Sequence, residues 1–271
     1  MAALAWGGSD FAGGLSSRRV GALIAVFYAD NIGLVGLLAA LPFVREPMPP
    51  LGIILISLGV GAIGSLSLTL LYHAMTTGQM SIAAPVSALL AAVLPILIGA
   101  FTEGLPGLMQ LFGFAFALAA VWLISQENGA RKPQLERLVD LRLPFLAGLG
   151  FGLYFVLIHQ ATQIATLWPM ILSRIGGMLF LLIILLIKRN RLSIDRGTWP
   201  FVTANGIVDV IGNLFYILAG QTGRMDVAAV LSSLYPGGTV FLAWFFLKER
   251  LNKSQGFGII AALVAIVLMT I

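Results

Sequence analysis

The sequence predicts an all-α membrane protein that crosses the bilayer ten times, as two inverted repeats of five helices. Three observations predict this architecture: an apolar composition, ten long apolar segments and an internal sequence repeat. Of the 271 residues, 59% are hydrophobic and only 10% are charged, whereas soluble proteins carry about 25% charged residues. A chain this poor in charge cannot cover itself with polar groups in water, so we expect lipid around it.

A membrane-spanning helix requires about 20 consecutive, mostly apolar residues. Ten segments meet this requirement: residues 2–17, 22–44, 51–76, 81–101, 107–125, 143–162, 168–187, 198–220, 226–247 and 254–271. The long polar stretch at 126–142 is predicted to be a cytoplasmic linker between a first repeat, 1–125, and a second, 143–271. Because the first span starts so abruptly, we expect a few residues to be missing upstream of it.

The two halves of the chain share sequence at a constant offset of 145 residues. Residues 74–89 and 219–234 are identical at eight of sixteen positions, and the same offset relates Phe112-Gly113 to Phe257-Gly258. Five spans are an odd number, so the second repeat must insert upside down relative to the first. Inverted repeats with a solute site at their interface are a recurrent transporter architecture.

The distribution of Lys and Arg predicts the orientation in the membrane. Thirteen of these residues lie in loops on one side, and only Arg45 and Arg224 lie in loops on the other. Positively charged loops remain in the cytoplasm. We therefore expect a multi-pass membrane protein with a cytoplasmic linker and both termini outside.

Several kinds of chemistry are missing from the sequence. It has no cysteine and two histidines, so we expect no disulfide, no metal site and no cofactor. Walker A, HExxH and GxSxG motifs are absent, which argues against ATP drive within this chain and against an enzyme with catalytic residues. The basic residues lie in short loops, which argues against a nucleic-acid partner. We expect a monomer whose partners are a small-molecule substrate and the lipid bilayer.

Several short motifs follow one another along the chain. They are Trp6-Gly-Gly-Ser-Asp10-Phe11, Leu231-Ser-Ser-Leu-Tyr-Pro236, Lys248-Glu249-Arg250-Leu251, and Gln255 with Gly258. In their order, spacing and duplication they resemble the EamA-type branch of the drug/metabolite transporter superfamily. The resemblance implies the ten-helix inverted-repeat fold, movement of small metabolites, often amino acids and often outward, and a central cavity lined mainly by spans one, three, four, six, eight and nine. It also implies cytoplasmic termini, in conflict with the charge count, which we follow.

Ionisable side chains at membrane depth cost about 2.5–3.5 kcal/mol each, so each one is a functional candidate. In span eight, Asp209, Asn213 and Tyr216 are spaced i, i+4 and i+7 and share one helix face. This stripe is either a substrate-amine contact or protonatable coupling site, or a hydrogen-bonded cluster that holds the bundle together. Both interpretations stay open.

In span one, Asp10 follows Trp6 by four residues, so a carboxylate lies beside an aromatic ring. This combination suits an ammonium group, through charge and cation–π attraction. The alternative is a carboxylate that reaches the interface or pairs with Arg18 or Arg19.

Two further regions contain candidates. Tyr72 and His73 end span three, where His73 could titrate near neutral pH and gate transport or be a structural group. Ser232 and Tyr235 precede Pro236, which weakens the helix and can free a carbonyl for solute. The predicted substrate-binding residues are Trp6, Asp10, Tyr72, His73, Tyr154, Asp209, Asn213, Ser232 and Tyr235.

Arg174 lies within span seven and needs a partner, because an unpaired arginine in lipid is costly. Asp30 in span two is the candidate. The pair is either a structural ion pair or a clamp for a substrate carboxylate.

Together these features predict a secondary transporter that exports amino acids, aromatic or other neutral ones, by alternating access. A multidrug or sugar permease of the same fold is the first alternative. A structural or regulatory membrane protein without transport activity is the second.

Overall fold

The computed structural model describes the chain except residues 78–79, 125–140, 191, 240–241, 243–251 and 271. Among the described residues every regular element is helical, and a single 3-10 turn, η1 (Leu41–Phe43), follows α2. The helices are α1 (Ala2–Val20), α2 (Ala22–Ala40), α3 (Leu51–Thr77), α4 (Met80–Thr102), α5 (Leu108–Ile124), α6 (Arg142–Ala161), α7 (Leu167–Ile187), α8 (Trp199–Thr222), α9 (Met225–Ser232) and α11 (Lys253–Thr270).

Seven of the described helical segments are long and apolar enough to cross a membrane. They belong to α2, α3, α4, α6, α7, α8 and α11, which confirms a polytopic membrane protein. The other three described helices fall short for different reasons. The apolar α5 has only 17 residues, α1 contains Gly, Ser and Asp10 where the longer spans contain Leu and Ile, and α9 has only eight residues.

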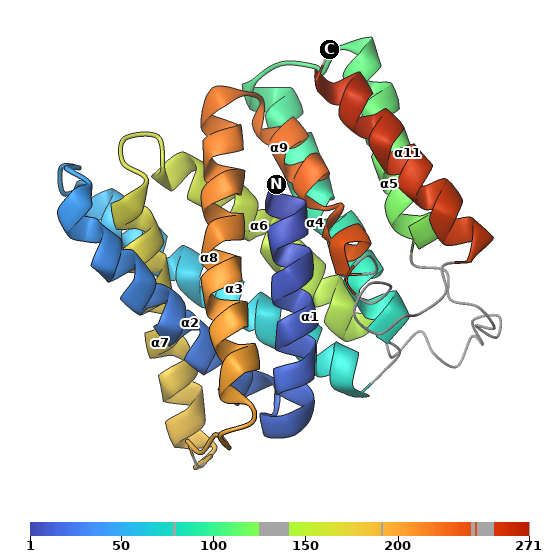
Figure 1. Ribbon diagram of the computed structural model, residues 1–271. Helices are drawn as coiled ribbons and strands as arrows, with labels where there is room; N and C mark the ends of the chain where they lie inside the picture. Colours follow the sequence, from blue (N-terminus) through green and yellow to red (C-terminus); the bar gives the residue numbers. More distant parts are fainter. Residues whose placement is uncertain (78–79, 125–140, 191, 240–241, 243–251, 271) are drawn as a thin grey trace.

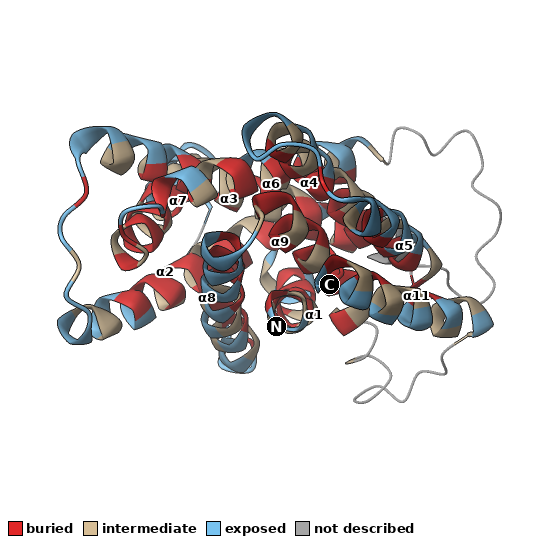
Figure 2. Ribbon diagram, turned by 90° about the horizontal axis from the view of Figure 1, so that it is seen from above, coloured by how far each residue is buried: buried red, intermediate tan, exposed pale blue. Residues whose placement is uncertain are grey.

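The distribution of side chains is that of a membrane protein, with apolar groups outside and polar groups inside. Large apolar residues such as Phe101, Trp122 and Leu186 are exposed. Asp10 and Asp30 are almost completely buried. Seen from above, buried residues turn toward the middle of the bundle and exposed ones outward (Figure 2). Burial of these carboxylates requires partners inside the bundle.

Helices that are far apart in the sequence pack against one another at the centre. α3 packs against α6 and α7, α4 packs against α6, and α1 and α2 both pack against α8. α5 and α11 lie side by side at one edge (Figure 1). The central part of the bundle is therefore built from both halves of the chain.

Glycines allow the closest of these contacts. A Cβ atom on Gly61 of α3 would overlap the backbone carbonyl of Ser173 in α7, and one on Gly148 of α6 would lie 2.6 Å from the carbonyl oxygen of Ser87 in α4. Small residues let membrane helices approach to backbone contact. These two positions fix how α6 and α7 lie against the first half.

The ninth predicted span, 226–247, is interrupted just before Pro236, where the sequence predicted a weakened helix. α9 ends at Ser232, residues 233–234 form a turn, and residues 235–239 are helical again. Pro236 lacks a backbone N–H and cannot donate to the carbonyl four residues earlier, which accounts for an interruption at this point. Most of the remaining span lies outside the described residues.

Candidate functional site

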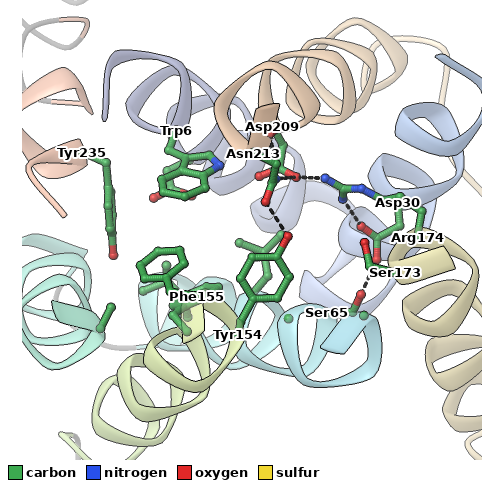
Figure 3. A pocket seen from close by; sticks show the side chains of 17 residues that line it. Trp6, Asp30, Ser65, Tyr154, Phe155, Ser173, Arg174, Asp209, Asn213 and Tyr235 are labelled. Atoms are coloured by element: carbon green, nitrogen blue, oxygen red, sulfur yellow. Dashed lines mark hydrogen bonds and ion pairs between the residues drawn. The ribbon is translucent and has the colours of Figure 1, made fainter. Parts of the chain in front are cut away.

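A cavity lies in the middle of the bundle, with about 680 Å³ of empty space, part of it open to the surroundings. It is lined by helices from both halves of the chain. The aromatic side chains of Trp6, Phe155 and Tyr235 lie at one end, and Asp30, Arg174 and Asp209 lie at the other (Figure 3). The lining residues are Trp6, Asp10, Asp30, Gly61, Gly64, Ser65, Leu68, Leu71, Ala91, Phe151, Tyr154, Phe155, Ser173, Arg174, Asp209, Asn213 and Tyr235.

The charged end is centred on Arg174 of α7. Its guanidinium donates to Asp30 of α2 at 2.5 Å and also to Asp209 of α8. All three side chains are at most 13% exposed. One guanidinium between two carboxylates leaves this cluster with one excess negative charge when all three groups are ionised.

Hydrogen bonds extend the cluster on both sides. The Ser65 hydroxyl of α3 donates to Asp30 at 2.5 Å, and the Asn213 amide donates to Asp209 at 3.0 Å. The Tyr154 hydroxyl of α6 in turn donates to the Asn213 amide oxygen at 2.5 Å. A continuous polar chain therefore joins α3, α2, α7, α8 and α6. Such networks are rigid when every member is satisfied.

At the aromatic end, Trp6 and Phe155 pack together with Tyr216, which lies behind the cavity wall and is not among the lining residues. Trp6 stacks on Phe155 with ring centroids 5.3 Å apart and an interplanar angle of 14°. Tyr216 packs against both rings, at 5.9 Å from Trp6 and 4.7 Å from Phe155, and its hydroxyl donates to the Phe155 carbonyl at 3.0 Å. One face of the indole is thus covered by Phe155 in this state, so an ammonium group could reach that face only after the ring moves.

Glycines make room for the aromatic side chains of the site. A Cβ atom on Gly212 of α8 would lie within 3.0 Å of the Trp6 indole, and one on Gly64 of α3 would lie 2.9 Å from the Tyr154 ring. Replacing either glycine would displace the ring beside it. These positions therefore control the shape of the cavity without contributing a functional group.

Asp10 has surroundings different from those of the Arg174 cluster. Tyr72 of α3 donates to its carboxylate at 3.2 Å, and neither Arg18 nor Arg19 pairs with it among the described ion pairs. Arg19 donates instead to the Gly197 carbonyl at 2.9 Å. The alternative in which Asp10 pairs with Arg18 or Arg19 is therefore not seen among the described ion pairs.

The predicted binding residues are not all at the cavity. Trp6, Asp10, Tyr154, Asp209, Asn213 and Tyr235 line it, together with Asp30 and Arg174. Tyr72 lies behind Asp10 and is fully buried. His73 is exposed near the end of α3, and Ser232 is buried at the end of α9. None of these last three is among the lining residues.

Sequence reasoning missed several residues of the site. Phe151 and Phe155 line the cavity but resemble any other apolar residue of a span. Ser65 is a small residue without charge in an apolar span, yet its hydroxyl donates to Asp30. Asn205 is fully buried in α8, four residues before Asp209. That i, i+4 spacing was the available signal that it shares the polar face.

Two glutamates of the first half hold helices of the second half at their N-termini. Glu46 accepts from the backbone N–H groups of Thr166 and Leu167, at 3.0 and 2.8 Å. Glu103 accepts from the N–H of Met225 at 3.2 Å. Both satisfy N–H groups that have no partner within the helix. They fasten α7 and α9 to the first half.

Arg224, just before α9, completes the second of these contacts. It donates to the Gly104 carbonyl at 2.8 Å and to the Asp226 carboxylate, also at 2.8 Å. The hydrogen bonds with Asp226 raise the pKa of Arg224 above its ordinary value. Arg224 is therefore a fixed positive charge at this end of the bundle.

The described residues contain no cluster of the side chains that usually bind metal ions in proteins. No group of three or more His, Cys, Asp or Glu side chains there lies close enough together to hold a metal ion. The three lining carboxylates are instead divided between Arg174 and Tyr72.

Comparisons with known proteins identify the family. The model of the EamA-like transporter family matches residues 141–271. The uncharacterized protein MJ1333.1 of Methanocaldococcus jannaschii is 32% identical over 122 residues, which are 45% of this chain and 88% of that relative. A crystal structure with 16% identity superposes with a TM-score of 0.74 over 98% of this chain and 95% of its own, which shows the shared fold alone. This chain belongs to the EamA-like transporter family.

Proposed function

We propose that this protein is a secondary transporter that exports amino acids, aromatic or other neutral ones, by alternating access around the central cavity. Its family suggests a transporter of the drug/metabolite type. The observation that carries the proposal is the cavity itself, which combines carboxylates, a guanidinium and an apolar aromatic wall between helices of both halves. An amino acid presents the complementary groups.

Recognition would use the two ends of the cavity. The ammonium group of the substrate would face Asp10 or Asp209, because a carboxylate attracts a cation strongly where water is scarce. The substrate carboxylate would join Arg174, whose guanidinium has five N–H donors and uses two nitrogens for Asp30 and Asp209. An apolar or aromatic side chain would lie against Phe151 and Phe155.

The architecture we propose is two inverted five-helix repeats, 1–125 and 143–271, joined by the linker 126–142. The helix contacts support it. In two such repeats α1, α2 and α3 correspond to α6, α7 and α8. The packing of α3 on α6 then corresponds to that of α8 on α1, and the packing of α3 on α7 corresponds to that of α8 on α2. The archaeal relative supports it as well. Since 122 matched residues are 88% of that relative, it is hardly longer than one proposed repeat.

Alternating access would require the two repeats to move against each other around the substrate. The Asp30–Arg174 pair joins α2 of the first repeat to α7 of the second, so it must move with the repeats or break. A substrate that engages Arg174 or Asp209 would weaken this contact. Substrate binding and the conformational change would thereby be coupled.

We further propose a monomer in the bacterial plasma membrane, with a cytoplasmic linker and both termini outside. The charge of the loops supports the orientation. The exposed apolar surface supports contact with lipid on all sides.

Flux measurements on reconstituted protein test the proposed function. Liposomes containing the purified protein are loaded with labelled amino acids, one at a time, and efflux is compared with that from protein-free liposomes. At least one amino acid should leave faster through the protein. Asp209→Asn should slow that efflux, whereas Asp195→Asn, in an exposed loop, should not. Efflux equal to that of empty liposomes for every amino acid would refute the proposal.

A second candidate is a permease for organic cations. The cavity is lined by the three carboxylates of Asp10, Asp30 and Asp209 but by one cationic side chain, Arg174, among the described residues. This excess of negative charge favours a substrate with a net positive charge. Faster efflux of a monovalent organic cation than of any neutral amino acid would favour this candidate over the first.

A further inference from the structure

Two carboxylates of the first half reach helices of the second half at the same end of the bundle. Glu46, between α2 and α3, accepts from the backbone N–H groups of Thr166 and Leu167 at the start of α7. Glu103, after α4, accepts from the N–H of Met225 at the start of α9. Both contacts lie in the upper part of Figure 1, opposite the loop between α7 and α8. They therefore join the two halves on one side of the central cavity.

Further interactions reinforce each of these contacts. The Trp168 indole donates to the carbonyl oxygen of Glu46 at 3.3 Å. Arg224, which precedes α9, donates to the carbonyl oxygens of Glu103 and Gly104 at 3.2 and 2.8 Å. Charge contributes as well, because a carboxylate is favoured at the positive N-terminal end of a helix. Each glutamate thus holds a helix of the other half by hydrogen bonds and by charge.

The internal repeat relates these helix starts to two others on the opposite side. α2 begins at Ala22 and α7 at Leu167, and α4 begins at Met80 and α9 at Met225, so the members of each pair are 145 residues apart. This is the offset that relates the two halves of the sequence. In the proposed architecture of two inverted repeats, the starts of α2 and α4 lie across the membrane from those of α7 and α9.

The charge of the two glutamates is reversed at the equivalent positions of the second half. The same offset relates Glu46 to Arg191 and Glu103 to Lys248. Both basic residues lie outside the part of the chain that the structure describes, but their charge follows from the sequence. A cation is disfavoured near the N-terminal end of a helix, where the dipole is positive. The favourable charge of the Glu46 and Glu103 contacts is therefore not repeated at these positions.

The described contacts between the halves on the opposite side are of a weaker kind. Arg19 donates to the carbonyl oxygen of Gly197 at 2.9 Å, and the Tyr28 hydroxyl lies 3.4 Å from the carbonyl oxygen of Leu192. Both contacts are exposed, and neither uses a carboxylate as acceptor. Hydrogen bonds with an ionised acceptor are stronger than those with a neutral one when the geometry is similar.

We propose that Glu46 and Glu103 form a gate that closes the cavity on their side of the membrane in the absence of substrate. The inference rests on the proposed function, because alternating access requires the two halves to separate on one side at a time. Since the charged contacts lie on the side of Glu46 and Glu103, the state closed on that side is the more populated one. Both contacts must break before the cavity opens there.

The gate has a consequence for the direction of transport. In the proposed orientation Glu46 and Glu103 lie on the outer side of the membrane. The empty protein would then keep its cavity accessible from the cytoplasm, where the substrate of an exporter is bound. Substrate would have to favour the state in which the two glutamate contacts are broken.

The accessibility of a cavity thiol tests the gate without any transport. The chain has no cysteine, so Leu68→Cys places a single thiol on the cavity wall. Right-side-out and inside-out membrane vesicles are treated with a membrane-impermeant thiol reagent. The side of the gate is the one from which Gly223→Cys, in an exposed loop beside α9, reacts. This assignment does not depend on the proposed orientation.

Weakening either contact should expose the cavity from the side of the gate. Glu46→Gln and Glu103→Gln should each raise the alkylation rate of Leu68→Cys from that side by about 2- to 5-fold, because each removes a favourable charge at a helix N-terminus. The rate from the opposite side should not rise. Glu46→Arg, which introduces the charge that the second half carries at position 191, should have a larger effect than Glu46→Gln.

Arg45→Gln is the matched control. Arg45 adjoins Glu46 and is exposed, so its replacement changes the charge of the same loop without touching the contact with α7. The alkylation rate should stay near that of the unaltered gate. An equal rise for Arg45→Gln and Glu46→Gln, no rise for Glu46→Gln, or a rise from both sides would overturn the gate. If Glu46→Gln does not yield folded protein, Glu103→Gln decides by the same criteria.

Efflux from liposomes separates this inference from the proposed function. Unchanged accessibility in Glu46→Gln, in protein that exports amino acids, would refute the gate and leave the proposed function intact. Accessibility that rises as predicted, in protein that moves no amino acid, would refute the proposed function and leave the gate.

Discussion

Arg174 of α7 and Asp30 of α2 form an ion pair of 2.5 Å across 144 residues of sequence. The same guanidinium also holds Asp209 of α8. One side chain thus connects the first half of the chain to two helices of the second at the charged end of the cavity. The site and the packing of the bundle depend on the same residue.

Removing this guanidinium should destabilise the protein strongly. Arg174→Ala leaves two buried carboxylates without their cation, and breaking a buried pair in this way costs about 3–5 kcal/mol. We expect a large fall in the denaturant midpoint of the purified protein in detergent. The triple variant Asp30→Asn, Arg174→Gln, Asp209→Asn should recover much of the loss, because no unpaired charge remains. Equal midpoints for wild type and Arg174→Ala would contradict a structural role.

Two glycines of α3 provide a matched test of helix packing. Gly61→Ala places a methyl group against the Ser173 carbonyl, whereas a Cβ atom on Gly59 meets nothing within 4 Å. Overpacking of this kind costs about 1–3 kcal/mol. The unfolding midpoint should fall for Gly61→Ala and stay near wild type for Gly59→Ala. Similar behaviour of the two variants would argue against the close contact of α3 with α7.

Phe155 should influence which amino acids are carried. Phe155→Leu keeps an apolar side chain but removes the ring against which an aromatic substrate would lie, and an aromatic pair contributes about 0.5–1.5 kcal/mol. We expect the KM for aromatic amino acids to rise by about 2- to 10-fold, with a smaller change for aliphatic ones. Phe112→Leu, on the exposed surface of α5, is the control and should leave both values unchanged. A uniform change across substrates would indicate a general packing defect.

The absence of cysteine from the sequence makes the proposed orientation directly testable. Single cysteines at Gly223, between α8 and α9, and at Ser193, between α7 and α8, both lie at exposed positions. In intact cells a membrane-impermeant thiol reagent should label Gly223→Cys and not Ser193→Cys. Permeabilised cells should show labelling of both. The reverse pattern in intact cells would place the termini in the cytoplasm.

The sequence predicted the helical segments well, because a helix in lipid must be long and apolar. Predicted segments such as 168–187 differ by a residue from the observed Leu167–Ile187. In the predicted span 226–247 the helix is interrupted next to Pro236, where the sequence predicted a weakened helix. The effect of a proline depends on its neighbours, since Pro85 and Pro95 lie within a continuous α4.

The site was predictable where a polar residue is unusual for its surroundings. Asp30 and Arg174 stand out in apolar spans, so their pairing could be anticipated from the cost of an unpaired charge. The role of Asp209 as a second partner of Arg174 could not, because it depends on how α8 lies beside α7. The role of Phe155 could not be predicted either. The sequence contains seventeen phenylalanines, and nothing in the sequence around Phe155 distinguishes it from those that face lipid.

Substrate protection of a cavity cysteine tests the central claim most directly. Leu68→Cys places a thiol on the cavity wall, and Gly223→Cys places one in an exposed loop. We predict that a transported amino acid slows alkylation at position 68 in a saturable manner and has no effect at position 223. Alkylation of Leu68→Cys that no amino acid slows, in protein that still exports amino acids, would contradict substrate binding in this cavity.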